Sequence, residues 1–344
     1  MVGPYTQAMP ETKAQAAPVG LDARTLGAAL RAMLAALRQH EEELNRLNVF
    51  PVRDHDTGTN MALTLAGVVA ALDARPEPEP NLAWIAKTAG GAALEEARGN
   101  SGVILAEALR GLLDTWAPLD LVGPAELARG FQVAASQARE AVLDPVEGTI
   151  LSVADATAAA VAATLEATPD AGTTVAALLA RAAAAAREAV TATRQQLRAL
   201  REAGVVDAAG YGLQLCLEAF AATAEEDAEP GIGPVDNGSA TPPKLARLAP
   251  GGPPGAEKGS GVDPSETGSP ALFEVQYLLA CDRDALEELS RELSAIGDSV
   301  TVGRGDGLFQ VHVHTEQAGA AIEAALRHGT PSRIQISYLG PSGA

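Results

Sequence analysis

The chain has 344 residues, which is enough for about two domains. Its formal net charge of −19 disfavours duplex nucleic acid and anionic membrane surfaces as partners, because both attract clusters of lysine and arginine. The 2 cysteines, Cys216 and Cys281, offer neither a disulfide framework nor a four-cysteine zinc site, so the sequence predicts a reducing, cytoplasmic setting.

The first part of the chain is predicted to be helical. Residues 1–20 are rich in proline, alanine and polar residues and are expected to be a flexible tail. From residue 21 to 225, apolar residues recur at helical spacing and no segment alternates like a strand for long. This pattern predicts an all-helical domain of about eight amphipathic helices. The expected helices cover residues 21–47, 58–74, 81–97, 103–116, 124–142, 150–167, 173–203 and 213–224.

A linker and a small second domain are predicted to follow. Residues 226–270 are loaded with glycine, proline, serine and acidic residues, which is typical of a disordered linker. Residues 271–340 carry strand and helix patterns in the order β-α-β-β-α-β, the split unit of ferredoxin-like domains. No stretch in the chain approaches the ~20 consecutive apolar residues that span a bilayer, so no membrane span is expected.

The stretch with the strongest chemical signal joins the first two helices. Asp54 and Asp56 point the same way if this segment is extended, and two carboxylates side by side suit Mg²⁺. The following residues, Thr57, Gly58, Thr59 and Asn60, offer free N–H groups at a helix start, where anions bind. An acidic surface turn with a helix cap is the alternative interpretation. A D-x-D-x-T phosphatase of the haloacid dehalogenase type is a further one, but it needs a parallel sheet.

Three other loops share this character. In an up-and-down barrel, the loops after the first, third, fifth and seventh helices lie at one rim. The loop of Arg98, Gly99, Asn100, Ser101 and Gly102 suits a phosphate, because its glycines allow close backbone approach. Residues 145–149 and 204–212 supply the remaining two loops. In the last loop, Asp207 is interpreted as a contact to a nucleotide ribose, as a residue that orients a neighbouring loop, or as a simple helix cap.

A possible zinc half-site lies in the small domain. His312 and His314 are two residues apart on one strand, and Glu274 on the first predicted strand is placed to join them. A polar sheet face with two ordinary histidines explains the same pattern.

Several of these motifs together resemble the catalytic subunit of bacterial fatty acid kinase, whose N-terminal domain is similar to the nucleotide-binding L subunit of dihydroxyacetone kinase. The small domain resembles the middle domain of that family through residues 297–299 and 312–315. The motifs of the helical part that carry the resemblance are residues 47–52, 54, 56–61, 97–105, 145–151 and 204–208.

The resemblance implies an eight-helix barrel that holds ATP through two Mg²⁺ ions. Asp54 and Asp56 would be Mg²⁺ ligands, and Asn48 would lie near a third ligand position. The residues that would face the phosphates are Thr57, Gly58, Thr59, Asn60, Asn100 and Ser101. The implied reaction transfers the γ-phosphoryl group to a fatty acid carboxylate that a separate acyl-binding protein presents, and the implied assembly is a homodimer formed through the small domain.

The sequence departs from the family at three places. Arg53 and His55 stand where the family usually has proline and glycine, and Glu274 stands where its zinc-binding cysteine would fall. The sequence ends at Ala344, soon after the predicted middle domain, and the family's C-terminal domain is not expected within these residues. Two alternatives therefore stay open, a non-catalytic nucleotide-binding assembly module and a dihydroxyacetone-type small-molecule kinase subunit.

Overall fold

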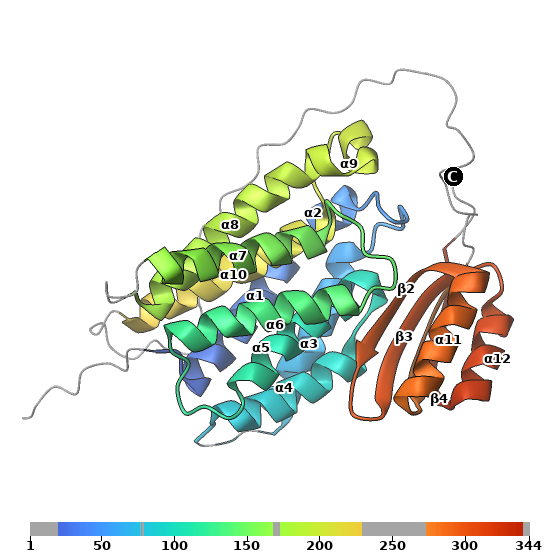
Figure 1. Ribbon diagram of the computed structural model, residues 1–344, viewed down its shortest axis with the longest axis horizontal. Helices are drawn as coiled ribbons and strands as arrows, with labels where there is room; N and C mark the ends of the chain where they lie inside the picture. Colours follow the sequence, from blue (N-terminus) through green and yellow to red (C-terminus); the bar gives the residue numbers. More distant parts are fainter. Residues whose placement is uncertain (1–19, 76, 78, 168–172, 229–272, 340–344) are drawn as a thin grey trace, which may run out of the picture.

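The computed structural model describes residues 20–75, 77, 79–167, 173–228 and 273–339. The predicted tail, except residue 20, and the linker after residue 228 lie outside the described residues. What is described forms a bundle of helices up to residue 228 and, from residue 273, a small sheet with two helices on one face (Figure 1).

The helical part is a closed ring of antiparallel helices. Each long helix packs against its neighbour in sequence, and α10 returns to pack against α1. The interior is filled mainly by leucine, valine and alanine, with Trp116, Tyr211 and Phe220 fully buried among them. The elements are α1 (Ala23–Gln39), α2 (Glu41–Leu47), α3 (Thr57–Ala74), α4 (Leu82–Glu96), α5 (Gly99–Trp116), α6 (Pro124–Glu140), α7 (Ile150–Ala167), α8 (Val175–Gln196), α9 (Arg198–Ala203) and α10 (Ala208–Ala228).

The predicted up-and-down barrel is confirmed, but several helix boundaries differ from expectation. The helix expected over 21–47 is broken at His40 into α1 and α2, and the one expected over 173–203 is broken at Leu197 into α8 and α9. Each break occupies a single residue, so the apolar period continues across it and hides it. In contrast, α5 and α10 begin earlier than predicted, since their first turns contain glycines that weaken the sequence signal for a helix.

The small part has the predicted β-α-β-β-α-β order. Its antiparallel sheet has the strand order β2-β3-β1-β4, and α11 and α12 cover one face. Alternate residues of the strands, such as Val275, Val311 and Val313, pack against these helices. The elements are β1 (Phe273–Ala280), α11 (Arg283–Ile296), β2 (Gly297–Arg304), β3 (Leu308–Thr315), α12 (Ala318–His328) and β4 (Thr330–Tyr338).

The other face of the sheet packs against one end of the helical bundle (Figure 1). There, Val142 forms a short antiparallel bridge with Thr301 on the edge strand β2. The Val302 N–H donates to Ala141 O at 2.8 Å, and the Leu143 N–H donates to Val300 O at 3.3 Å. The segment after α6 thus extends the sheet by one short strand, and the two parts of the chain are joined by backbone hydrogen bonds.

Within the described residues, α7 is long and apolar enough to cross a membrane by length and composition alone. This is weak support for a span, because a core helix meets the same criterion, and α7 packs between α6 and α8 in the ring.

Candidate functional site

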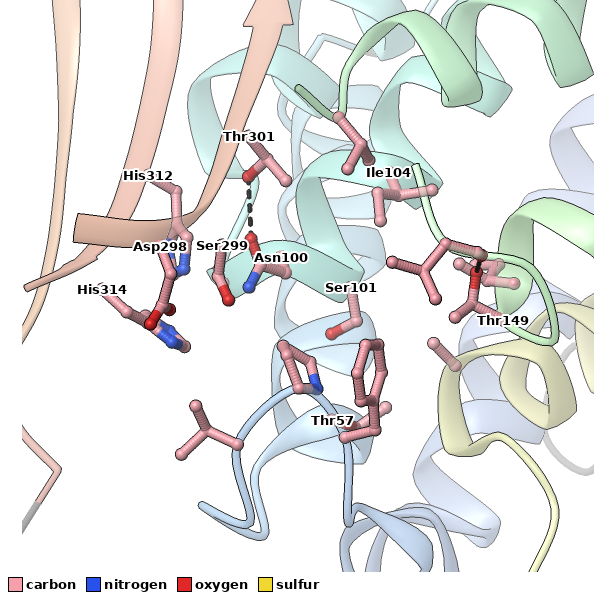
Figure 2. Close-up of a pocket in the computed structure, with 18 of the residues that line it drawn as sticks. Thr57, Asn100, Ser101, Ile104, Thr149, Asp298, Ser299, Thr301, His312 and His314 are labelled. Atoms are coloured by element: carbon pink, nitrogen blue, oxygen red, sulfur yellow. Dashed lines mark hydrogen bonds between the residues drawn. The ribbon is translucent and has the colours of Figure 1, made fainter. Parts of the chain in front are cut away.

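A pocket of about 320 Å³ lies where the bundle meets the sheet. Each of the four loops that were expected at one rim contributes to its wall, and the small domain supplies the opposite wall. Figure 2 shows the two walls, with Asp298, Ser299, His312 and His314 on the side of the sheet and Thr57, Ser101 and Thr149 on the side of the bundle. The site is therefore built from both parts of the chain.

The loop before α3 brings Asp54 and Asp56 into this pocket. Burial raises the pKa of Asp54 to about 8, and the neighbouring charge of Asp56 acts in the same direction. Two carboxylates are thus crowded together in a half-buried place, which favours either a shared proton or a bound cation. Arg53 and His55 are exposed and do not line the pocket.

His55 adopts a backbone conformation that is uncommon for its residue type. Its φ is 60°, in the left-handed region that glycine enters without steric cost. The resemblance placed a glycine at this position, and the backbone gives a physical reason for one. Here the turn is stabilised instead by a hydrogen bond of 3.1 Å between His55 Nδ1 and the main-chain carbonyl oxygen of Asn45.

Asn48 is buried beside the two carboxylates. Its Nδ2 donates to Asp54 Oδ1 at 3.0 Å and contacts Val52 O at 3.3 Å. Its Oδ1 is buried and has no hydrogen-bond partner among the described residues. A buried amide oxygen without a donor is costly, and a hard cation would satisfy it. Asp54, Asp56 and Asn48 thus form a donor set that fits Mg²⁺.

Only part of the first turn of α3 faces the pocket. Thr57 and Asn60 line the pocket. Gly58 and Thr59 do not, and their backbone N–H groups both donate to the side chain of Asn45. Of the four residues that the sequence proposed as phosphate contacts at this helix start, the structure places two at the pocket.

The loop of residues 98–102 is also divided. Gly99, Asn100 and Ser101 line the pocket, in the first turn of α5. Arg98 instead reaches the small domain, where it donates to Gln335, and it pairs loosely with Glu96 at 3.8 Å.

Gly102 lies outside the pocket as well. A Cβ at Gly102 would lie 2.4 Å from Thr64 Oγ1, so this glycine allows α5 to approach α3. Asn100 is held by the small domain, because the Thr301 hydroxyl donates to its Oδ1 at 3.0 Å (Figure 2).

Asp207 links the last loop to its surroundings. It is buried, its carboxylate accepts the Gly210 N–H at 2.7 Å, and its own N–H donates to Thr193 Oγ1 at 3.0 Å. Burial raises its pKa to about 6, while backbone hydrogen bonds from Gly210 and Ile150 act in the opposite direction. The bond from the Gly210 N–H, three residues later at the start of α10, is the one a helix cap makes, and the bond from Ile150 connects Asp207 to the start of α7. Asp207 also lines the pocket.

The structure brings Glu274, His312 and His314 together on the sheet. Their potential ligand atoms all lie within 4.8 Å of one another, and Glu274 is directly opposite His314 in the antiparallel register. Nδ1 of His312 lies 3.3 Å from Glu274 Oε1. Nε2 of His312 and Nδ1 of His314 are buried without a hydrogen-bond partner among the described residues. Burial lowers the pKa of both histidines, which keeps them neutral, the form that binds metals.

This cluster faces the carboxylates of the bundle. Burial raises the pKa of Glu274 to about 7, and the charge of Asp56 adds to the rise. Asp56 also acts on the pKa of His314, in the direction opposite to burial. The two candidate metal-binding groups therefore belong to one electrostatic environment in one pocket.

Sequence reasoning missed the apolar side of the pocket and several polar residues of β2. The apolar residues could not be distinguished from core positions by their spacing. The polar ones, Asp298, Ser299 and Thr301, follow Gly297 in a motif whose resemblance was noted without a role. The lining residues to which the sequence assigned no role include Phe50, Ile104, Ile150, Asp298, Ser299, Val300 and Thr301.

Comparison with known proteins gives matches over both parts of the chain. The DAK2 domain family matches residues 51–222, and the FakA-like middle domain family of fatty acid kinase matches residues 271–341. Protein YloV of Bacillus subtilis is 30% identical over 325 residues, which is 93% of this chain and 56% of that protein. An uncharacterized protein of Staphylococcus haemolyticus is 30% identical over 317 residues, 88% of this chain and 52% of that protein. The chain thus spans about half the length of the curated relatives it matches.

Two solved structures show a remote likeness. The native dihydroxyacetone kinase of C. freundii has a TM-score of 0.43 at 17% identity, over 65% of this chain and 38% of that one. The same enzyme in complex with AMP-PNP and Mg²⁺ has a TM-score of 0.44 at 19% identity, over 64% of this chain and 38% of that one.

Proposed function

The chain belongs to the family of DAK2-domain proteins that carry a FakA-like middle domain, a family of kinase type, and from this membership we propose that it is an ATP- and Mg²⁺-dependent phosphotransferase. The proposed reaction moves the γ-phosphoryl group of ATP to the carboxylate of a fatty acid, which a separate acyl-binding protein presents. The proposed setting is the cytoplasm.

The observation that carries the proposal is the donor set of Asp54, Asp56 and the unpartnered Asn48 Oδ1 beside a half-apolar pocket. These three side chains would hold Mg²⁺, which neutralises phosphate charge when it is bound. Asn100 and Ser101 in the first turn of α5, with Thr57 and Asn60 of α3, are placed to orient phosphate oxygens. The apolar side, with Ile104 and Ile150, offers a surface for a purine base.

The chemistry needs little from the chain beyond positioning. A fatty acid is ionised at neutral pH, so its carboxylate oxygen can attack the γ-phosphorus without a general base. The new bond joins that oxygen to phosphorus, the bond to the β-γ bridging oxygen breaks, and ADP leaves with the electron pair. The sheet wall with Asp298, Ser299 and Thr301 covers the pocket and would limit the access of water as a competing acceptor.

Zinc is proposed for Glu274, His312 and His314. Two neutral imidazoles and a carboxylate are a ligand set found in zinc enzymes that keep an open coordination position. The buried nitrogens without partners support this assignment. Near-stoichiometric zinc in elemental analysis of the purified protein, lost in His312→Ala, is the expected result. A metal-free protein with full activity would exclude the assignment.

Calorimetry with ATP and Mg²⁺ tests the proposed nucleotide site. We expect binding by the native chain and none by Asp54→Ala or Asp56→Ala. Asp73→Ala is the matched control, since Asp73 lies at the far end of α3, where it forms an exposed ion pair with Arg31. If Asp54→Ala and Asp56→Ala bind ATP as tightly as the native chain does, the proposal is overturned.

Turnover with different acceptors separates the kinase from its alternatives. An acyl-loaded binding protein should support ATP consumption and acyl phosphate formation. Turnover with dihydroxyacetone alone would identify the small-molecule kinase instead. Binding of ATP without transfer to either acceptor would identify an assembly module.

A further inference from the structure

The first turn of α3 is capped by a residue from another helix. Asp56 is the N-cap residue of α3, but its side chain makes no capping hydrogen bond. Instead, Oδ1 of Asn45, on α2, accepts the N–H of Gly58 at 2.7 Å and the N–H of Thr59 at 3.1 Å. These are the second and third N–H groups of the helix, the pair that an N-cap side chain normally satisfies.

Other helices of the chain show the ordinary arrangement. Asp22, Asn81, Thr174 and Asp282 are N-cap residues, and each accepts the N–H of the residue three positions later with its own side chain. At α3 the equivalent N–H, that of Thr59, is already bonded to Asn45. The Asp56 carboxylate is therefore not needed at the helix start and lies in the wall of the pocket.

Asn45 is itself held in place. Its Nδ2 donates to Thr59 Oγ1 at 3.0 Å, and the Thr59 hydroxyl donates to Glu41 Oε1 at 2.7 Å. The main-chain carbonyl oxygen of Asn45 contacts Nδ1 of His55 at 3.1 Å. His55 is the residue between Asp54 and Asp56 in the sequence. A Cβ on Gly58 would lie 2.4 Å from Glu41 O, so α2 and α3 approach this closely only because that residue is glycine.

We propose that Asn45 is a positioning residue for the metal site. It occupies the N–H groups that Asp56 would otherwise cap, and it thereby keeps the Asp56 carboxylate turned to the pocket and available to a divalent cation. This inference rests on the proposed function, since it assigns a role toward the Mg²⁺ that the function requires. Without Asn45, capping competes with metal binding for the same carboxylate, and Mg²⁺ affinity falls by about three- to tenfold.

The test measures the Mg²⁺ concentration that gives half-maximal binding of a fluorescent ATP analogue to the full chain. Asn45→Ala is expected to raise this concentration by about three- to tenfold. Asn45→Asp keeps an oxygen that accepts both N–H groups, so it is expected to restore most of the affinity. Asn81→Ala removes an ordinary cap, at the start of α4, and is expected to lower the melting temperature without changing the Mg²⁺ requirement.

The outcomes separate the inference from the function beneath it. If the native chain shows no Mg²⁺-dependent binding, the proposed function fails and this role fails with it. If the native chain binds and Asn45→Ala needs no more Mg²⁺ than the native chain, the positioning role alone is overturned. Should Asn45→Ala not fold, Thr59→Val removes the hydroxyl that holds Asn45 and is expected to raise the Mg²⁺ requirement to a smaller extent. An unchanged requirement in Thr59→Val would then overturn the role.

Discussion

The backbone N–H of Gly99 donates to Gln276 Oε1 at 3.2 Å, across the boundary between the helical bundle and the small sheet. Gly99 lies at the pocket in the loop that resembles a phosphate-binding loop, so this N–H group would be a natural phosphate donor. In the arrangement described, a side chain of the small domain already holds it. Docking of the sheet and the proposed binding of a phosphate would therefore compete for one donor.

Gln276→Ala is expected to tighten nucleotide binding about fivefold, because removing the competing acceptor frees one hydrogen bond worth about 1 kcal/mol. Calorimetry with ATP and Mg²⁺ measures the change. Gln310→Ala is the matched control, since Gln310 contacts the carbonyl of Ala97 rather than an N–H group. Weaker binding by Gln276→Ala would show that Gln276 assists the nucleotide instead.

Glu274→Cys is expected to increase zinc affinity, since a thiolate is a softer ligand than a carboxylate and restores the residue type implied by the resemblance. Glu274→Ala, which leaves only the two histidines as ligands, is expected to lower the zinc affinity. Competition with a chromophoric chelator ranks the three proteins. The same zinc affinity in all of them would mean that residue 274 is not a ligand.

Asp207→Asn is expected to change how stability depends on pH. Burial raises the pKa of Asp207 from 3.8 in the unfolded chain to about 6 in the folded one, so the native protein holds this proton more tightly. The contribution of Asp207 to the stability of the native chain is therefore lost as pH rises from about 4 to above 6, and it amounts to about 3 kcal/mol. The asparagine cannot titrate and escapes this loss.

Chemical denaturation of both proteins between pH 4 and 7 measures the effect. The free energy of unfolding of Asp207→Asn should rise relative to that of the native chain across this range. Asp155→Asn, which removes a partly exposed carboxylate, controls for the general effect of charge. A difference in the free energy of unfolding between Asp207→Asn and the native chain that stays constant from pH 4 to 7 would contradict the expectation.

Ile336→Lys is expected to disrupt the homodimer that the resemblance implies for this chain. Ile334, Ile336 and Tyr338 lie on β4, an edge strand, with exposed fractions of 43%, 51% and 64%. An edge strand with apolar side chains is a template for pairing with a second chain, and a charge at its centre opposes pairing. Sedimentation velocity should show a dimer for the native chain and a monomer for the variant.

Leu63→Lys is the control for this experiment, because Leu63 is a comparably exposed apolar residue, at 52%, on α3 of the bundle. If the dimer persists in Ile336→Lys and is lost in Leu63→Lys, the interface lies in the helical part of the chain instead.

The fold was largely predictable because its signals are local. Helical periodicity predicted the helices of the bundle, and strand alternation predicted the order of the small domain. The helix break at His40 was not predictable, since the residues on both sides favour a helix. The start of α5 at Gly99 was not predictable either, because glycine is typical of loops and the bond from Gly99 to Gln276 comes from a distant segment.

The candidate site was predictable only in part. Loop parity predicted which loops would meet, and the pattern of Asp54 and Asp56 suggested a metal. Local sequence does not show where an N–H group is directed, so the bonds of Gly58 and Thr59 to Asn45 came only from the structure. The same holds for Arg98, which a partner on β4 draws toward the small domain.

The bridge between Val142 and Thr301 has a consequence for assembly. It places a segment of the bundle along the β2 edge of the sheet, so within the described residues β4 is the edge left open along its length. A sheet with two open edges can add copies without limit and form fibres. A sheet with one open edge pairs once, by a two-fold axis, and then has no edge left to offer. If the homodimer that the resemblance implies forms through β4, the contact that completes the pocket wall would also limit growth to a pair of chains.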